Sequence, residues 1–341
     1  MSTLIQEMTN TVVALTAPGK GILAADESSG TIEKRFEAVG VPSTGQSRRD
    51  YRELLFSTPG LDAFISGAIL FDETIKQKTI AGLALPELLK ANGILCGIKV
   101  DIGTVPLVSF PGEKITEGLD GLKQRLTEYK KRGAQFAKWR AVISIGTSIP
   151  TVQTIAANAH ALAIYAAHCQ DLGLVPIVEP EVLMDGDHTL EVCARVTEET
   201  LHTLFRKLHD RRVALECMIL KPNMVVPGAA CSEQATPEKV AQATLACLRR
   251  TVPAAVPGIF FLSGGQGEVV ATVNLNAINA NPEKQPWVLS FSYGRALQAP
   301  VLLAWRGDAA NITSAQLALN HRAKLNSAAR RGSYDAAMEN D

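Results

Sequence analysis

The sequence lacks the marks of a secreted or membrane protein. Its six cysteines are scattered and form no C-x-x-C pair, and its opening residues, MSTLIQEMTN, contain neither the basic start nor the apolar run of a signal peptide. No apolar stretch approaches the roughly eighteen residues that a membrane-spanning helix needs. We therefore expect a reduced, cytoplasmic protein that has no membrane partner.

The sequence also lacks an excess of charge of either sign. Lysine plus arginine number 34, aspartate plus glutamate also number 34, and the basic residues are spread along the chain. A protein that binds nucleic acid usually carries a basic patch that neutralises phosphates. We therefore expect no nucleic-acid partner, and a small molecule is the better candidate.

A domain linker is missing as well. No segment rich in proline, glycine or serine divides the 341 residues, although this length alone would suggest two domains. Barrel folds of this length occur as one unit. We therefore expect residues 1–341 to form a single domain, with a short polar C-terminal tail from about residue 330 to residue 341.

What the sequence does contain is a series of short apolar runs that end in polar residues or glycine. Between the runs lie longer stretches whose apolar residues recur at helical spacing. Such alternation favours an α/β protein, namely a (β/α)8 TIM barrel of parallel strands. An open doubly wound sheet is the weaker alternative, because the first run is not followed by G-x-G-x-x-G. The runs span residues 21–26, 67–71, 97–101, 136–142, 176–181, 217–223, 258–264 and 288–294.

Charged residues occupy unusual places in these runs. The segment AQFAKWRAV has the length and apolar character of a strand, yet it carries Lys138 and Arg140. Strand alternation puts these two cations on one face, and it likewise puts Glu179 and Glu181 on one face of the next strand. Lys221 ends the strand after that, so the three strands predict one cluster at the C-terminal mouth of the barrel, where the carboxylates compensate the cations.

Each of these residues has a plainer explanation when taken alone. A lysine at a strand end is usually solvated, and the EPE segment would suit the start of a helix, where carboxylates are favoured. Lys138 and Lys221, however, lie inside apolar runs. The joint pattern therefore favours a functional site.

Two lysines beside a carboxylate indicate amine chemistry. A lysine attacks a ketone only when its amine is neutral, so its ordinary pKa of about 10.4 has to fall. For Lys221 we expect both burial and the neighbouring cation Lys138 to lower the pKa. Loss of water from the adduct needs an acid, a role for which Glu179 is placed. The resulting protonated imine is an electron sink that permits retro-aldol cleavage, in which Asp26 is a further candidate base.

Two groups of anion donors lie near this cluster. The LSGGQG and SYGRA segments, after the seventh and eighth strands, offer Ser263, backbone N–H groups of Gly264 and Gly265, and Arg295. A second group, which we expect on the far side of the mouth, consists of Ser28, Thr31, Lys34, Arg35 and Lys99. Two anion sites that flank one amine predict a substrate with phosphate at both ends.

Metal chemistry has little support in the sequence. The six histidines mostly lie in helical patterns and show no H-E-x-x-H spacing, so we expect no metal. His188 follows the fifth strand in a loop, where we interpret it as a helix cap or surface residue. Cys96 and Cys217 are expected to be small core residues.

The motifs GKGILAADES, GIKVDIGTVPL, FAKWRAV, PIVEPE, LKPNMV, FLSGGQ and SFSYGRALQ occur in this order. Together they resemble class I fructose 1,6-bisphosphate aldolase from about residue 17 to about residue 330. The resemblance implies a barrel without metal or cofactor, a homotetramer, and a role in glycolysis and gluconeogenesis. It implies that Lys221 forms the Schiff base, that Glu179 is the main acid and base with Glu181 and Lys138 in support, and that Asp26 acts near the C4 hydroxyl.

The resemblance also divides the phosphate donors between the two ends of the substrate. For the C1 phosphate it implies Ser263, Gly264, Gly265, Gly294 and Arg295. For the sugar or its C6 phosphate it implies Lys99, Ser28, Thr31, Lys34, Arg35 and Arg140, and it adds Ser292 as a further substrate contact.

The chain departs from the family pattern at two places. Animal members end in a tyrosine that enters the site, whereas this chain ends in MEND and its last tyrosine is Tyr334. Ile102 replaces a lysine that many relatives carry, which removes a positive charge near Lys99. Two other functions stay open on the residues alone: a different Schiff-base lyase or transaldolase with one phosphate clamp, and a catalytically silent sugar-phosphate-binding or scaffold protein.

Overall fold

Eight parallel strands close into a barrel in the computed structural model, which describes residues 2–340. Neighbouring strands pair in parallel throughout, and β1 pairs with both β2 and β10, which closes the ring. An open sheet is thereby excluded, and the predicted barrel is confirmed. In order around the barrel the strands are β1 (Gly21–Ala25), β10 (Val288–Tyr293), β9 (Gly258–Phe261), β8 (Ile219–Leu220), β7 (Val175–Val182), β6 (Phe136–Ile143), β3 (Leu95–Lys99) and β2 (Ile65–Leu70).

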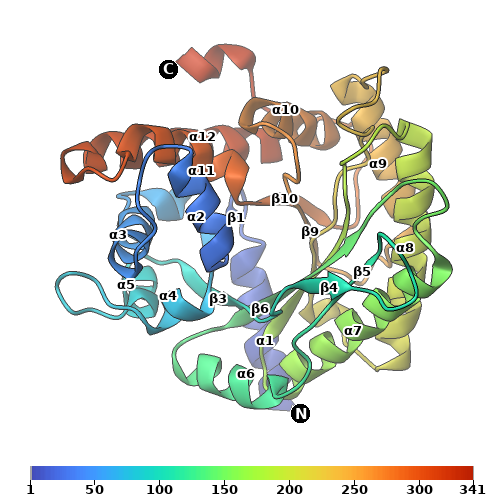
Figure 1. Cartoon of the computed structure of the whole chain (residues 1–341), viewed down its shortest axis with the longest axis horizontal. Helices are drawn as coiled ribbons and strands as arrows, with labels where there is room; N and C mark the ends of the chain where they lie inside the picture. Colours follow the sequence, from blue (N-terminus) through green and yellow to red (C-terminus); the bar gives the residue numbers. More distant parts are fainter. Residues whose placement is uncertain (1, 341) are drawn as a thin grey trace.

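Helices surround the strands, with α7 and α8 on one side of the barrel and α3 and α5 on the other (Figure 1). Within residues 2–340 none of these helices combines the length and apolarity that a membrane crossing requires. The α-helices are α1 (Ser2–Leu15), α2 (Ser29–Glu37), α3 (Gly45–Phe56), α4 (Asp72–Lys76), α5 (Leu85–Ala91), α6 (Leu122–Lys131), α7 (Val152–Asp171), α8 (Leu190–Asp210), α9 (Pro237–Thr251), α10 (Glu268–Asn279), α11 (Arg295–Trp305) and α12 (Ile312–Arg330). Short 3-10 helices are η1 (Leu61–Ala63), η2 (Leu215–Cys217), η3 (Ala309–Asn311) and η4 (Ala336–Asn340).

Threonine residues fix where several helices begin. The hydroxyls of Thr44, Thr151, Thr189 and Thr236 each accept a hydrogen bond from the backbone N–H three residues further on. Such a cap satisfies one of the free N–H groups of the first turn and is worth about 1 kcal/mol. The caps at Thr151, Thr189 and Thr236 end the loops that follow β6, β7 and β8 at the mouth.

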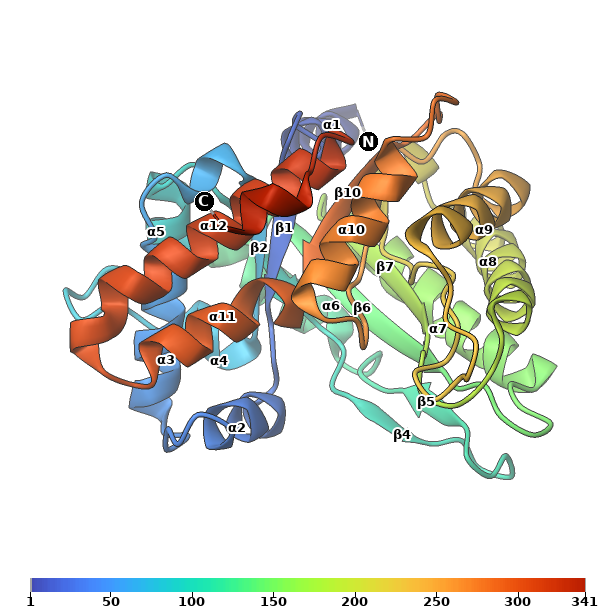
Figure 2. The same cartoon turned by 90° about the horizontal axis from the view of Figure 1, so that it is seen from above.

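The N-terminal helix α1 closes one end of the barrel. Its side chains Met8, Val12 and Leu15 pack with inward residues of the strands, among them Phe136 and Phe260, in one apolar cluster. In Figure 2, α1 lies at one end of the barrel, and α2 and the β4 and β5 hairpin lie at the other. The floor of the barrel is therefore packed with apolar side chains, and the C-terminal mouth is the end that is open to a ligand.

Two segments add to what the sequence predicted. An antiparallel hairpin, β4 (Thr104–Pro106) and β5 (Lys114–Thr116), stands beside the mouth and was not predicted. The expected polar tail is folded: Tyr334 is 9% exposed, its backbone N–H donates to Asn276 on α10, and Glu339 on η4 pairs with the buried Arg322 of α12. Partners on α10 and α12 therefore hold this polar segment against the barrel.

Glycine at position 97 makes room for an aromatic ring in the barrel floor. A Cβ placed on Gly97 would lie 2.1 Å from a ring carbon of Phe136, and one placed on Gly67 would lie 3.0 Å from the same ring. Phe136 has no exposed surface, so its ring has no free space into which it can move. The two glycines therefore permit the large side chain on β6 to fill the interior.

We expect Gly97→Ala to destabilise the protein by about 1–3 kcal/mol, because the added methyl overpacks a filled core. The free energy of unfolding from urea titration measures this. Gly30→Ala is the matched control, since a Cβ there meets nothing within 4 Å and no loss of stability is expected. A Gly97→Ala protein as stable as the wild type would show that the floor around Phe136 is loosely packed.

Candidate active site

A cavity of about 1180 Å³ opens at the C-terminal mouth of the barrel. Its walls contain every catalytic residue predicted from the sequence, together with all the predicted substrate-binding residues except Gly265. They come from the ends of β1, β3, β6, β7, β8, β9 and β10 and from the segments that follow. The strand-end rule therefore located the cavity correctly.

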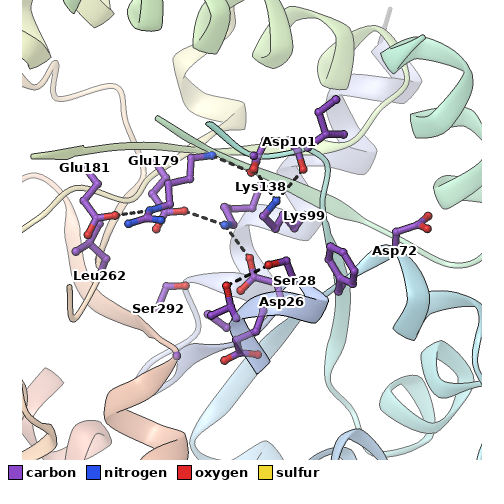
Figure 3. Close-up of a pocket in the computed structure, with 18 of the residues that line it drawn as sticks. Asp26, Ser28, Asp72, Lys99, Asp101, Lys138, Glu179, Glu181, Leu262 and Ser292 are labelled. Carbon is purple, nitrogen blue, oxygen red and sulfur yellow. Dashed lines mark hydrogen bonds and ion pairs between the residues drawn. The ribbon is translucent and has the colours of Figure 1, made fainter. Parts of the chain in front are cut away.

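A buried carboxylate joins the two lysines at the centre of the cavity. Lys221 Nζ lies 3.1 Å from Glu179 Oε1, and Lys138 Nζ lies 3.1 Å from Glu179 Oε2. Lys138 Nζ also lies 2.7 Å from Asp26 Oδ2, so its side chain stands between Asp26 and Glu179 (Figure 3). None of these four side chains is more than 11% exposed.

The charges of this cluster are set by the competition between burial and pairing. Burial alone would lower the pKa of Lys138, but the carboxylates of Asp26 and Glu179 outweigh it and raise that pKa above its ordinary value. Burial would raise the pKa of Glu179, yet Lys138, Lys221 and Arg140 lower it, and the pKa of Asp26 is lowered in the same way by Lys138 and Lys221. At neutral pH Lys138 is therefore a cation and both carboxyl groups are anions.

The sequence predicted that carboxylates compensate the cations and that Glu179 serves as the acid. In the structure Glu179 lies between the two amines as an ion. It must first accept a proton before it can donate one.

Two further ion pairs hold cations at the rim of the cavity. Arg140 Nε donates to Glu181, and burial is again outweighed by carboxylates, which raise the pKa of Arg140. Lys99 Nζ lies 2.6 Å from the Asp101 carboxylate and donates to the Asp101 carbonyl at 2.7 Å. Asp101 was missed, although it lies two residues after Lys99, the spacing that places strand residues on one face.

Donors from β9, β10 and α11 form one part of the rim. Arg295, the first residue of α11, donates to the Gly264 carbonyl at 3.1 Å, and Gly264 has a left-handed φ of 56° that suits glycine. Ser292 is 1% exposed and its hydroxyl has no hydrogen-bond partner within residues 2–340. A buried hydroxyl without a partner in the cavity wall is a suitable ligand contact.

Gly265 does not line this cavity. A Cβ at this position would lie 2.5 Å from the sulfur of Met184, in the loop after β7, so the Met184 side chain would have to shift to make room for it. The phosphate contact from the backbone N–H of Gly265 stays a prediction.

The α2 donors also lie elsewhere than expected. Ser28, Thr31, Lys34 and Arg35 line the cavity, with Ser28 Oγ 3.1 Å from Thr31 Oγ1. They follow β1, which pairs directly with β10, so they adjoin the Arg295 rim and are not across the mouth from it. Among the second group of donors, only Lys99 on β3 lies across the barrel from β9.

Comparison with known proteins identifies the family of this site. The sequence model of class I fructose-bisphosphate aldolase, a glycolytic enzyme family, matches residues 7–341. The chain belongs to the class I fructose-bisphosphate aldolase family. It is thus a lyase of the metal-independent class, which cleaves fructose 1,6-bisphosphate reversibly into dihydroxyacetone phosphate and glyceraldehyde 3-phosphate.

Individual aldolases support this assignment over nearly the whole chain. A probable class 1 fructose-bisphosphate aldolase of Xylella fastidiosa is 54% identical and covers 97% of this chain and 99% of that one. The cytosolic fructose-bisphosphate aldolase 4 of Arabidopsis thaliana is 55% identical over 93% of this chain and 81% of its own length. A crystal structure of the Plasmodium falciparum aldolase, in complex with TRAP and an inhibitor, has a TM-score of 0.97 at 50% identity and covers 98% of this chain and 97% of that chain.

Three further residues complete the comparison with the sequence prediction. His188 was expected to be a cap or surface residue, but it is 8% exposed, neither ring nitrogen has a partner among residues 2–340, and Thr189 is the cap. Tyr334 donates its hydroxyl to Glu339 and does not line the cavity. Ile102 lies on the cavity rim with 67% exposure.

We expect Lys138→Met to lower the free energy of unfolding at pH 7 by about 3–5 kcal/mol, since two buried carboxylates lose their shared cation. Lys76→Met is the control, because Lys76 and Asp72 form a pair that is 43% and 44% exposed and contributes at most about 1 kcal/mol. Urea titrations of both variants measure the difference.

The same variant should change how stability depends on pH. Asp26 and Glu179 have lowered pKa values in the folded state, so their contribution is present above the ordinary carboxyl pKa of about 4 and is lost as pH falls below it. Removing the cation raises both pKa values, so the free energy of unfolding falls less at acid pH in Lys138→Met than in the wild type. An equally steep fall in both proteins would contradict the charges assigned to Asp26, Glu179 and Lys138.

Proposed function

We propose that Lys221 is the nucleophile of the aldolase reaction and that Glu179 moves its protons. Support comes from the single observation that Glu179 Oε1 lies 3.1 Å from Lys221 Nζ in a buried cavity, while its pKa is lowered. An ionised Glu179 accepts a proton from the Lys221 ammonium, which leaves a free amine. The amine then attacks the C2 ketone of the open-chain substrate.

The next step in this proposal uses the proton that Glu179 has gained. The carbinolamine hydroxyl takes this proton and leaves as water, so a protonated imine forms between C2 and Lys221. Lys138 stays charged throughout, because its pKa is raised by two carboxylates. Its charge stabilises Glu179 each time that residue returns to the ionised form.

Cleavage requires a base for the C4 hydroxyl. In our proposal Asp26, which is ionised and 2.7 Å from Lys138, takes the C4 hydroxyl proton. The C3–C4 bond breaks, its electron pair moves toward the imine to give an enamine, and the C4 aldehyde leaves as glyceraldehyde 3-phosphate. Glu181 supports this arrangement by holding Arg140 at the rim.

We assign the two phosphates to two parts of the rim. The C1 phosphate is bound by Ser263, Gly264, Gly294 and Arg295, and the sugar and C6 phosphate by Ser28, Thr31, Lys34, Arg35, Lys99 and Arg140, with Ser292 as a further contact. All of these line one cavity, and five of them carry positive charge. Guanidinium and ammonium groups form the strongest hydrogen bonds to phosphate.

The organisation and location of the protein are part of the same proposal. We infer one domain, because closure of the barrel uses strands from Gly21 to Tyr293. We infer a homotetramer and a cytoplasmic location from the family resemblance, and a cytosolic relative occurs in Arabidopsis thaliana. No observation favours a transaldolase or a silent binding protein.

Incubation with dihydroxyacetone phosphate followed by borohydride should add the mass of the reduced adduct to the peptide that contains Lys221. Lys221→Met should abolish cleavage, because no amine remains at that position, while the phosphate donors still bind the substrate in calorimetry. Lys130→Met is a control outside the cavity that should be labelled and active. An adduct on another lysine, or turnover by Lys221→Met, would refute the assignment.

A further inference from the structure

We propose that Glu27 is a positioning residue that aims Arg35 and the α2 donors at the C6 phosphate, and this inference rests on the proposed function. Glu27 is 8% exposed and follows Asp26 at the end of β1. Consecutive residues of an extended segment point in opposite directions. Asp26 extends toward Lys138, whereas Glu27 extends toward the helices that cover the strand.

Glu27 connects three helices to the end of β1. Its Oε1 accepts from Arg35 on α2 and, at 2.8 Å, from Gln298 Nε2 on α11, while its Oε2 lies 2.7 Å from Arg52 Nη2 on α3. Each partner comes from a different helix, so one carboxylate sets the position of α2 relative to α3, α11 and the barrel. Its signal in the sequence is weak, since Glu27 is recognisable there only as an acidic residue next to Asp26.

The two arginines that contact Glu27 differ in how much of each side chain is exposed. Arg52 is 3% exposed, so it needs a permanent counterion, which Glu27 supplies. The side chain of Arg35 is 24% exposed and lines the cavity, so it offers N–H groups both to Glu27 and to the cavity. A guanidinium carries five N–H donors in a fixed plane. Glu27 can therefore hold one part of the Arg35 fork while the remainder stays free for phosphate.

Because Glu27 already holds Arg35, phosphate binding has less side-chain motion to restrict. A free arginine side chain loses rotamer entropy when it binds, and an arginine already fixed by a carboxylate has lost most of it before the phosphate arrives. Ser28 and Thr31 lie on the same short helix, so they are placed by the same contact.

The α11 side of the rim has a second attachment and depends less on Glu27. Gln298 Nε2 also donates to the Ala24 carbonyl of β1 at 2.8 Å. This bond persists if Glu27 becomes a glutamine, so Gly294 and Arg295 keep their place. The two phosphates should therefore respond differently to the loss of the Glu27 charge.

The test is the steady-state cleavage of fructose 1,6-bisphosphate and fructose 1-phosphate by Glu27→Gln. We expect KM for the bisphosphate to rise about tenfold, the effect of one lost charge-assisted contact. KM for fructose 1-phosphate should change less than about twofold, since this substrate has no C6 phosphate for the α2 donors. Reductive labelling of Lys221 by dihydroxyacetone phosphate should persist.

Two matched variants separate positioning from a general loss of charge. Glu37→Gln removes an exposed carboxylate from the same helix and should behave as the wild type. Glu27→Asp keeps the charge on a shorter side chain and should give an intermediate KM for the bisphosphate. If Glu27→Gln does not fold because Arg52 loses its counterion, Glu27→Gln with Arg52→Met removes both buried charges and should show the same difference between substrates.

Equal increases in KM for both substrates, or no increase for either, would overturn the proposal and leave Glu27 a merely structural residue. Failure of the proposed function would give a different result, because Lys221 of the wild type would then not be labelled by dihydroxyacetone phosphate and borohydride. If only the positioning role of Glu27 is wrong, Lys221 is still labelled and the enzyme is still active.

Discussion

The contact of the Glu179 carboxylate with the Nζ atoms of both Lys138 and Lys221 organises the charges of the site. Burial of one unpaired ion costs several kcal/mol, so neither Lys138 nor Lys221 could lie in this cavity alone. Glu179 and Asp26 together supply the negative charge, and Arg140 and Lys99 carry carboxylate partners of their own. The cavity is thus a set of balanced charges.

The barrel supplies the rigidity that this balance requires. Lys138, Glu179 and Lys221 stand on three adjacent strands, whose backbone hydrogen bonds fix the spacing of the side chains. The α1 helix seals the floor, and Phe136 fills it, so the apolar cluster below the charges excludes water from one end. Rigid strands therefore carry the reacting groups, whereas α2 and the loops carry the phosphate donors.

Much of the fold and of the site could be predicted from sequence, because strand alternation and the strand-end rule are local patterns. Lys138 and Glu179 were placed on neighbouring strands from their spacing alone. The partners of Glu27 could not be predicted, since Arg52 and Gln298 lie far from it in sequence and meet it only after the barrel closes. The predicted closed barrel already puts the first strand beside the eighth, so the place of the α2 donors next to the Arg295 rim was predictable and was missed.

The charge states of Glu179 and Lys138 in the free protein can be observed by neutron diffraction from a deuterium-exchanged crystal at pH 7, which locates the exchangeable deuterons. We expect Glu179 to carry no deuteron, because the neighbouring cations lower its pKa, and Lys138 to carry three. A deuteron bonded to a Glu179 oxygen, beside a neutral Lys138, would show that the two groups do not form an ion pair.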